Sequence, residues 1–140
     1  MILSEDIIQT LLERARQARE QAYAPYSGFR VGAAVLTASG EIFAGANIEN
    51  ASFGATVCAE RVAIWSAVAA GQRQITALAV VADTPAPVAP CGLCRQVLQE
   101  FAEPECPIIM ANLQGEYRLV TLAELLPLAF SWPGTESERK

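Results

Sequence analysis

The amino-acid sequence predicts an α/β protein: a three-layer α/β/α sandwich around a mixed, largely parallel five-stranded sheet. Segments with helical spacing of apolar residues alternate with short apolar, β-branched runs that are typical of interior strands. Helices that separate single buried strands indicate crossover connections, which join parallel strands. The 140 residues fit one domain, which we place at 1–130, followed by a polar tail at 131–140 that we expect to be disordered.

The predicted elements are a helix at 4–22, strands at 29–37 and 41–46, a helix at 57–70, a strand at 76–82, a helix at 91–102, strands at 106–111 and 116–120, and a helical turn at 121–126. Ser4 is the expected N-cap of the first helix, whose apolar residues follow helical spacing. The turn at 38–40 separates two strand-like runs and predicts a β-hairpin, which adds an antiparallel strand. The polar, small residues at 47–56 indicate a loop.

The second half of the chain is justified in the same way. Gly71 is a typical stop after the Ala-rich helix. The apolar, β-branched run at 76–82 suits an interior strand. Three prolines, Pro85, Pro87 and Pro90, exclude regular structure before the next helix.

Composition and charge exclude several function classes. The net charge of −5 repels phosphate backbones, and no Lys/Arg stripe is visible, so we expect no nucleic-acid partner. The densest basic group (Arg14, Arg16, Arg19) lies among acidic residues and predicts a solvated helix face. No apolar stretch approaches the roughly 20 residues that span a bilayer, and no basic-then-apolar leader opens the chain. We therefore expect no membrane partner and a cytoplasmic location.

The sequence has no histidine, which excludes a Ser-His-Asp triad, a Cys-His pair and any histidine-ligated metal. A proton carrier in this chain must be a carboxylate, a tyrosine, a cysteine or Lys140, the single lysine at the C-terminus. Thiols stay reduced in the cytoplasm, so the four cysteines indicate metal ligands or core residues rather than disulfides.

Two short segments carry candidate chemistry: Cys58-Ala59-Glu60-Arg61 and Pro90-Cys91-Gly92-Leu93-Cys94-Arg95-Gln96. Each opens a predicted helix, where free N–H groups and the helix dipole favour thiolate, the form that binds metal. Cys91 and Cys94 share one helix face and can bind one ion. Three cysteines, with Cys58, leave a fourth tetrahedral position open, which is typical of catalytic zinc. Glu60 can reach the same point as a general base.

Other interpretations of these residues remain open at this stage. A Cys-x-x-Cys pair can be a thiol–disulfide couple, and Cys106 could complete a closed, structural four-sulfur zinc site. As a lone cysteine in an apolar strand, however, Cys106 is more typical of a small buried core residue. The two arginines of these segments, Arg61 and Arg95, could be ordinary surface charges.

Beyond these two segments, which match the signature of zinc nucleobase deaminases, the chain resembles the small, all-cysteine cytidine deaminases over residues 5–130. The further motifs are Pro25-Tyr26-Ser27 with Phe29 and Val31-Gly32-Ala33-Ala34, the loop Gly45-Ala46-Asn47-Ile48-Glu49-Asn50-Ala51-Ser52, and Glu124-Leu125-Leu126-Pro127 with Phe130. The resemblance implies zinc-dependent deamination of cytidine and 2'-deoxycytidine in pyrimidine salvage. It also implies a homotetramer with sites at subunit boundaries.

The resemblance implies a role for each matching residue. Cys58, Cys91 and Cys94 would bind one zinc ion per chain, and Glu60 would shuttle protons. The ribose contacts would be Asn47 and Glu49, the base contacts Phe29 and the Ala59 backbone, and Phe130 would close the pocket of another subunit. We add the hypothesis that Arg61 offsets the negative charge of three thiolates on zinc.

Several of these residues also have a purely structural interpretation. Asn47 and Glu49 could be solvated loop residues, and Phe29 could be a core residue. Phe53 departs from the tyrosine that the family often has after Ala51-Ser52, which puts a subunit contact or a pocket hydrogen bond in doubt. Blasticidin-type nucleoside deaminases share the zinc segments, and deaminases of tRNA or single-stranded DNA are a further alternative; the ribose-loop sequence and the acidic charge favour free cytidine nucleosides.

Overall fold

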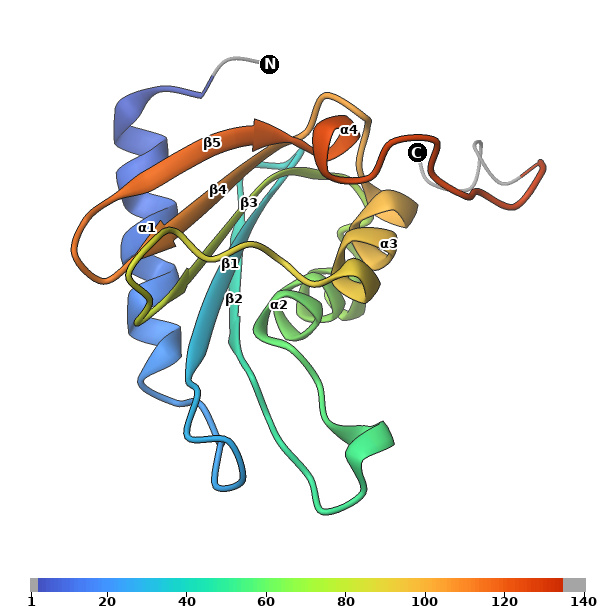
Figure 1. Ribbon diagram of the computed structural model, residues 1–140. Helices are drawn as coiled ribbons and strands as arrows, with labels where there is room; N and C mark the ends of the chain where they lie inside the picture. The colour runs from blue at the N-terminus through green and yellow to red at the C-terminus, as the bar shows by residue number, and fades with distance from the viewer. Residues whose placement is uncertain (1–2, 135–140) are drawn as a thin grey trace.

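The computed structural model describes residues 3–134, and residues 135–140 of the tail expected to be disordered lie outside that range. A five-stranded sheet lies between helices on both of its faces (Figure 1). The elements are α1 (Glu5–Arg19), β1 (Val31–Thr37), β2 (Ile42–Ala46), the 3-10 helix η1 (Phe53–Ala55), α2 (Ala59–Ala69), β3 (Ile75–Ala82), α3 (Gly92–Phe101), β4 (Pro107–Asn112), β5 (Tyr117–Thr121) and α4 (Leu122–Leu125). The predicted element order and the three layers are confirmed; η1 was expected to be loop.

The sheet has the strand order β2-β1-β3-β4-β5, and it is mixed as predicted. The expectation that it is largely parallel is wrong, because β3 and β4 form the one parallel pair among these strands. The crossover through α2 does join strands of one direction, but β1 lies between β2 and β3 and pairs antiparallel with both. At the other edge β5 returns as a hairpin on β4.

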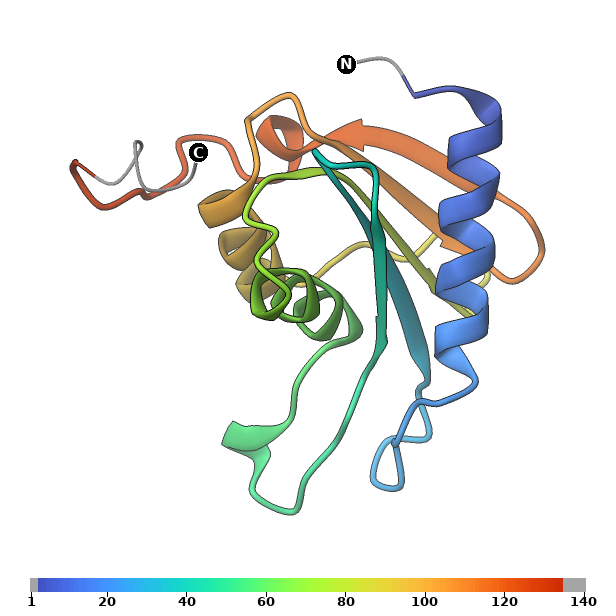
Figure 2. The ribbon, with the colours of Figure 1, turned by 180° about the vertical axis from the view of Figure 1, so that it is seen from behind.

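Among the helices in residues 3–134, α1 alone covers one face of the sheet (Figure 2). Ser4 caps it as predicted, because its hydroxyl accepts a hydrogen bond from the Ile7 N–H at 3.2 Å. Leu11, Leu12 and Ala15 of the helix are buried against the strands. Gly32 permits this close approach, since a Cβ at that position would lie 1.9 Å from the Ala15 carbonyl oxygen.

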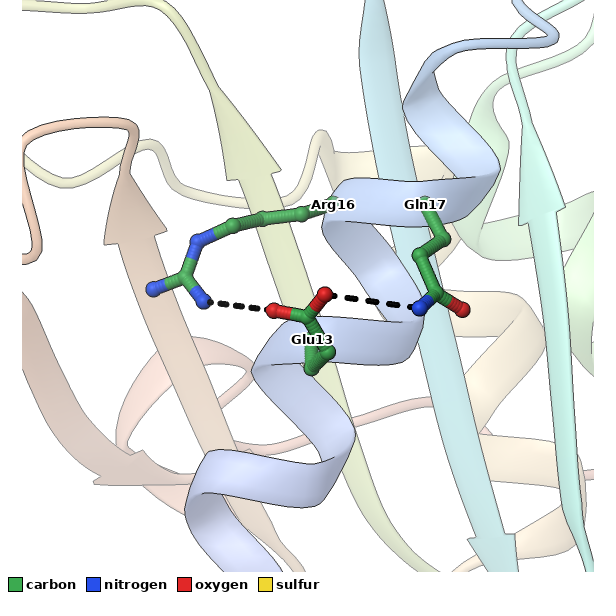
Figure 3. A network of polar contacts seen from close by, with 3 residues as sticks. All are labelled: Glu13, Arg16 and Gln17. Carbon is green, nitrogen blue, oxygen red and sulfur yellow. Dashed lines mark hydrogen bonds and ion pairs between the residues drawn. The ribbon is translucent and has the colours of Figure 1, made fainter.

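The outer face of α1 carries the basic group that the sequence singled out. Glu13 lies 3.4 Å from Nη1 of Arg16 and accepts a hydrogen bond from Gln17, also at 3.4 Å (Figure 3). This exposed pair fits the predicted solvated face. Arg19 differs, because its Nε donates to the Arg30 carbonyl at 3.0 Å and so ties the helix to the segment before β1.

α2 and α3 cover the other face and bring their N-termini together. Their apolar residues, Ala63, Ile64 and Leu98 among them, form the second core cluster with inward residues of the sheet. Gly71, with φ +89°, ends α2 as predicted. Because β2 and β3 run in the same direction, α2 and α3, which follow them, begin at the same edge of the sheet. Within residues 3–134 no helix combines the length and the apolar character needed to cross a bilayer.

Candidate metal centre and substrate pocket

Three cysteine thiols meet where α2 and α3 begin. Cys58 is the N-cap of α2, Cys91 is the N-cap of α3, and Cys94 lies in the first turn of α3. The Sγ atoms of Cys58 and Cys91 are 3.7 Å apart, those of Cys91 and Cys94 are 3.3 Å apart, and all three lie within 4.8 Å of one another. Sulfurs bound to one tetrahedral zinc at a Zn–S distance of ~2.3 Å are separated by about 3.8 Å. The spacing therefore fits zinc.

Cys106 does not join this cluster. It precedes β4, at the opposite end of the strand from the α2 and α3 N-termini, and its Sγ contacts the Pro107 carbonyl at 3.7 Å. Burial raises the pKa of its thiol to about 12. The closed four-sulfur site is thus contradicted, and the prediction of a small buried residue is confirmed.

The cluster favours ionised sulfur at Cys58. A hydrogen bond with the Cys94 thiol, followed by one from the Arg61 guanidinium, lowers the pKa of Cys58 to about 5 against the opposing effect of burial. The same hydrogen bond and burial raise the pKa of Cys94. A metal ion that binds here must displace the thiol protons that remain.

Glu60 carries a buried carboxyl group beside the thiols. It is the second residue of α2, and only 4% of its surface is exposed. Burial raises the pKa of Glu60 to about 7, and the Cys58 charge contributes further. A carboxyl group with a pKa near neutrality can both accept and donate a proton, as general acid–base catalysis requires.

Arg61 contacts the cluster from the following position of α2. Its Nη2 donates a hydrogen bond to Sγ of Cys58 at 3.5 Å, and its guanidinium carbon lies 5.8 Å from the centre of the Trp65 ring. Its Nε is buried and is the one buried side-chain polar atom without a hydrogen-bond partner among the described residues. These contacts exclude the alternative that Arg61 is an ordinary surface charge.

A pocket of about 280 Å³ opens in front of Cys58, Glu60 and Cys91. Of the predicted substrate contacts, Phe29, Asn47, Glu49 and Ala59 line it. The structure also places there residues for which the sequence predicted no role: Ser27, Val31, Thr56, Val57, Val80, Val88 and Ala89. Most are apolar, and their only sequence signal is their position beside the motifs. Phe29 is 44% exposed, which excludes the alternative that it is a core residue.

Asn47 and Glu49 are held firmly at the pocket wall. The Asn47 amide accepts from the Val31 N–H at 2.9 Å and donates to the Phe29 carbonyl at 2.8 Å. Glu49 accepts from the Tyr26 N–H at 2.9 Å, and from both the N–H and the hydroxyl of Ser27. The hydroxyl is the main cause that keeps the pKa of Glu49 below its usual value, and the two N–H groups add to it. Neither residue is a merely solvated loop side chain.

Phe130 lies apart from the pocket of its own chain. Its side chain is 63% exposed and packs edge-on against Trp132, with ring centres 6.2 Å apart. Its carbonyl accepts a hydrogen bond from Gln96 of α3 at 3.0 Å. The predicted contact with the pocket of another subunit stays a prediction.

Convergent thiols, an adjacent open pocket and a buried carboxyl group are the features of a catalytic metal site in an α/β protein. Residues 5–110 match the family model described as the cytidine and deoxycytidylate deaminase zinc-binding region. The chain is 53% identical over 123 residues to a cytidine deaminase of Halalkalibacterium halodurans, covering 88% of this chain and 93% of that protein. It is 52% identical over 124 residues to a cytidine deaminase of Sporosarcina psychrophila, covering 89% and 91%.

Comparison with solved structures points to the same family. The crystal structure of cytidine deaminase from Burkholderia pseudomallei matches with a TM-score of 0.85 at 48% identity, covering 91% of this chain and 100% of that chain. The present chain therefore belongs to the cytidine deaminase family of enzymes, in its small, all-cysteine form.

Proposed function

We propose that this chain deaminates cytidine and 2'-deoxycytidine with water, giving uridine and 2'-deoxyuridine and releasing ammonia. One zinc ion per chain would be held by Cys58, Cys91 and Cys94. The observation that carries the proposal is the placement of the buried Glu60 carboxyl in the same pocket as Cys58 and Cys91. This pairing supports a catalytic rather than a structural metal.

Zinc, when bound, supplies Lewis acidity that lowers the pKa of a coordinated water toward neutrality. Glu60 accepts a proton from the attacking water and delivers it to N3 of the pyrimidine. It then takes the second proton from the hydroxyl group newly formed at C4 and passes it to the departing amino group, so that ammonia leaves and the C4 oxygen becomes a carbonyl. One carboxyl group thus serves as base and then as acid. Its raised pKa of about 7 suits both directions of transfer.

The walls of the pocket support recognition of a nucleoside. Phe29 would stack on the pyrimidine, and the Ala59 backbone would hold the base edge. Asn47 and Glu49 would hydrogen-bond the ribose hydroxyls. Their hydrogen bonds to the segment 26–31 fix both side chains before substrate arrives, which reduces the entropy cost of binding.

We infer a homotetramer in which Phe130 closes the pocket of a neighbouring subunit. The exposed aromatic side chains support an assembly, since they leave large apolar surfaces in contact with water: Phe53, Trp65, Phe130 and Trp132. Phe53 packs edge-on against Tyr26, with ring centres 6.5 Å apart, so the missing family hydroxyl leaves an apolar contact in place.

We further infer that free nucleosides rather than nucleic acids are the substrates, that the enzyme acts in pyrimidine salvage, and that it works in the cytoplasm. The net charge of −5 and the Glu49 carboxylate in the pocket oppose a phosphate backbone. The described cysteines are free thiols, which suits a reducing compartment.

The test follows the ultraviolet absorbance of cytidine and deoxycytidine with purified protein, beside E60Q, with zinc measured in both. Turnover should fall at least about 100-fold in E60Q while zinc stays near one per chain. Bound zinc without turnover in the wild type would contradict the substrate, and equal turnover in E60Q would contradict the proton shuttle. No metal and a reversible disulfide would favour the thiol–disulfide alternative. Tight binding of single-stranded DNA that weakens steeply with salt would favour a nucleic-acid deaminase.

A further inference from the structure

Arg95 links the second metal-binding segment to the C-terminal helix. It lies one residue after Cys94 in α3, and its Nε donates to the Pro90 carbonyl at 2.8 Å. Its Nη1 donates to the Leu125 carbonyl, also at 2.8 Å. Pro90 is buried and directly precedes Cys91. One guanidinium therefore bridges the peptide that carries Cys91 and the last residue of α4.

α4 is a firm support for this bridge despite its length. A capping box closes its N-terminus: the Thr121 hydroxyl accepts from the Glu124 N–H at 3.2 Å, and the Glu124 carboxylate accepts from the Thr121 N–H at 3.1 Å. The fully buried Leu122 anchors the helix in the core. The Leu125 carbonyl at its C-terminus lacks a partner within the helix, and Arg95 supplies one.

The two hydrogen bonds explain why an arginine is found at this position, because a cation in the first turn of a helix opposes the helix dipole. Two short hydrogen bonds to carbonyls offset that cost. Arginine suits the task because its planar group presents N–H donors in several fixed directions. A lysine ammonium is a point charge. It could reach only one of the two carbonyls, and the geometry of that contact would be less fixed.

We propose that Arg95 is a positioning residue for the metal site: it fixes the Pro90–Cys91 peptide against α4 and so holds the Cys91 thiol beside Cys58 and Cys94. This inference rests on the zinc binding proposed above. It assigns no contact with substrate to Arg95. Loss of the bridge frees the Cys91 ligand to leave the metal, because Cys91 is exposed and its backbone then lacks this anchor.

The direct test measures the rate at which zinc passes from folded protein to a coloured chelator, well below the unfolding temperature. R95M should release zinc about 10-fold faster than the wild type, and R95K should lie between them. R73M is the control, since Arg73 is exposed in the turn beyond the far end of α2. Thermal unfolding of each zinc-loaded protein separates faster release from general destabilisation.

A second variant tests the support from the other side. T121A removes the capping box without touching α3 and should also release zinc faster than the wild type, by less than R95M. Wild-type release rates in R95M and T121A would overturn the bridge. If R95M does not fold, the comparison of R95K with T121A carries the same decision. Absence of zinc from the wild-type protein would contradict the proposed function itself, which keeps the two failures distinct.

Discussion

Arg61 donates a hydrogen bond from Nη2 to the Sγ atom of Cys58, 3.5 Å away and one turn earlier on α2. Three thiolates around a Zn²⁺ ion would leave the site with a net charge of −1. That charge blunts the Lewis acidity on which hydrolysis depends. The Arg61 guanidinium lies where it can offset the excess, and we propose that this role explains a cation in the unfavourable first turn of α2.

R61A should therefore weaken both zinc retention and turnover, each by about 10-fold or more. R16A is a matched control, because Arg16 makes one exposed ion pair on the outer face of α1. Zinc content by atomic absorption and steady-state turnover check the prediction. An R61A protein with wild-type zinc and wild-type rate would contradict the role given to Arg61.

A substitution at Asn47 should affect substrate binding more than the chemical step. In N47D the amide donor to the Phe29 carbonyl is lost, while an oxygen that accepts from the Val31 N–H remains. The pocket wall that carries Phe29 should loosen, and the new charge repels the carbonyl. We expect KM for cytidine to rise by about 10-fold or more with a smaller loss in kcat. The reverse pattern, with kcat lost and KM kept, would argue against a binding role.

Glu49 predicts a dependence of stability on pH. Its pKa is lower in the folded protein than the ordinary value of 4.5, mainly because the Ser27 hydroxyl hydrogen-bonds the carboxylate. The stability that this pair contributes is complete above the unfolded pKa and is lost as the pH falls through the folded one. The difference in Tm between wild type and E49Q should thus be largest above about pH 5 and shrink as the pH falls below the ordinary pKa of 4.5.

S27A provides the matched comparison for that experiment. It removes the largest contributor to the lowered pKa of Glu49 and should therefore lose part of the pH dependence of stability that E49Q loses completely. A difference in Tm between wild type and E49Q that is the same at every pH would show that the carboxylate charge contributes nothing to the fold.

A side chain at Gly45 should clash with α2, on the face of the sheet that carries the metal site. A Cβ at this position would lie 2.7 Å from the Ala63 nitrogen and 2.7 Å from Cγ1 of Val62, so α2 would have to move away from β2. G45A should lower the free energy of unfolding by about 1–3 kcal/mol in urea titrations. G54A is the control, because nothing lies within 4 Å of a Cβ there. Equal stability of the two variants would mean that α2 adjusts without cost.

Local signals predicted the elements of this fold well. The Ser4 cap, the Gly71 stop and the three prolines before α3 each act within a few residues of the chain, and the structure has the boundaries where they indicated. The strand order was beyond such signals. Whether β1 inserts between β2 and β3 depends on which long-range pairing buries more apolar surface, and spacing along the chain does not record that choice.

The same division holds for the site. Cysteine spacing and helix starts predicted that Cys58, Cys91 and Cys94 come together. The contacts of Asn47, Glu49 and Arg95 were not predictable, since each joins backbone groups distant in sequence. A signal for the arginines existed, however. A cation in the first turn of a helix is disfavoured, so Arg61 and Arg95 could have been marked as residues with a specific partner.

The cysteines of the proposed metal site lie before and after β3 in the sequence, which bears on the order of folding and metal binding. Cys58 leaves the ribosome 33 residues ahead of Cys91, and β3 must join the sheet between them for the two thiols to lie side by side. Apolar clusters on both faces of the sheet supply the driving force for that pairing. We therefore expect this chain to fold without zinc, unlike a zinc finger. Cells starved of the metal should accumulate folded, inactive enzyme that a later supply of zinc can switch on without new synthesis.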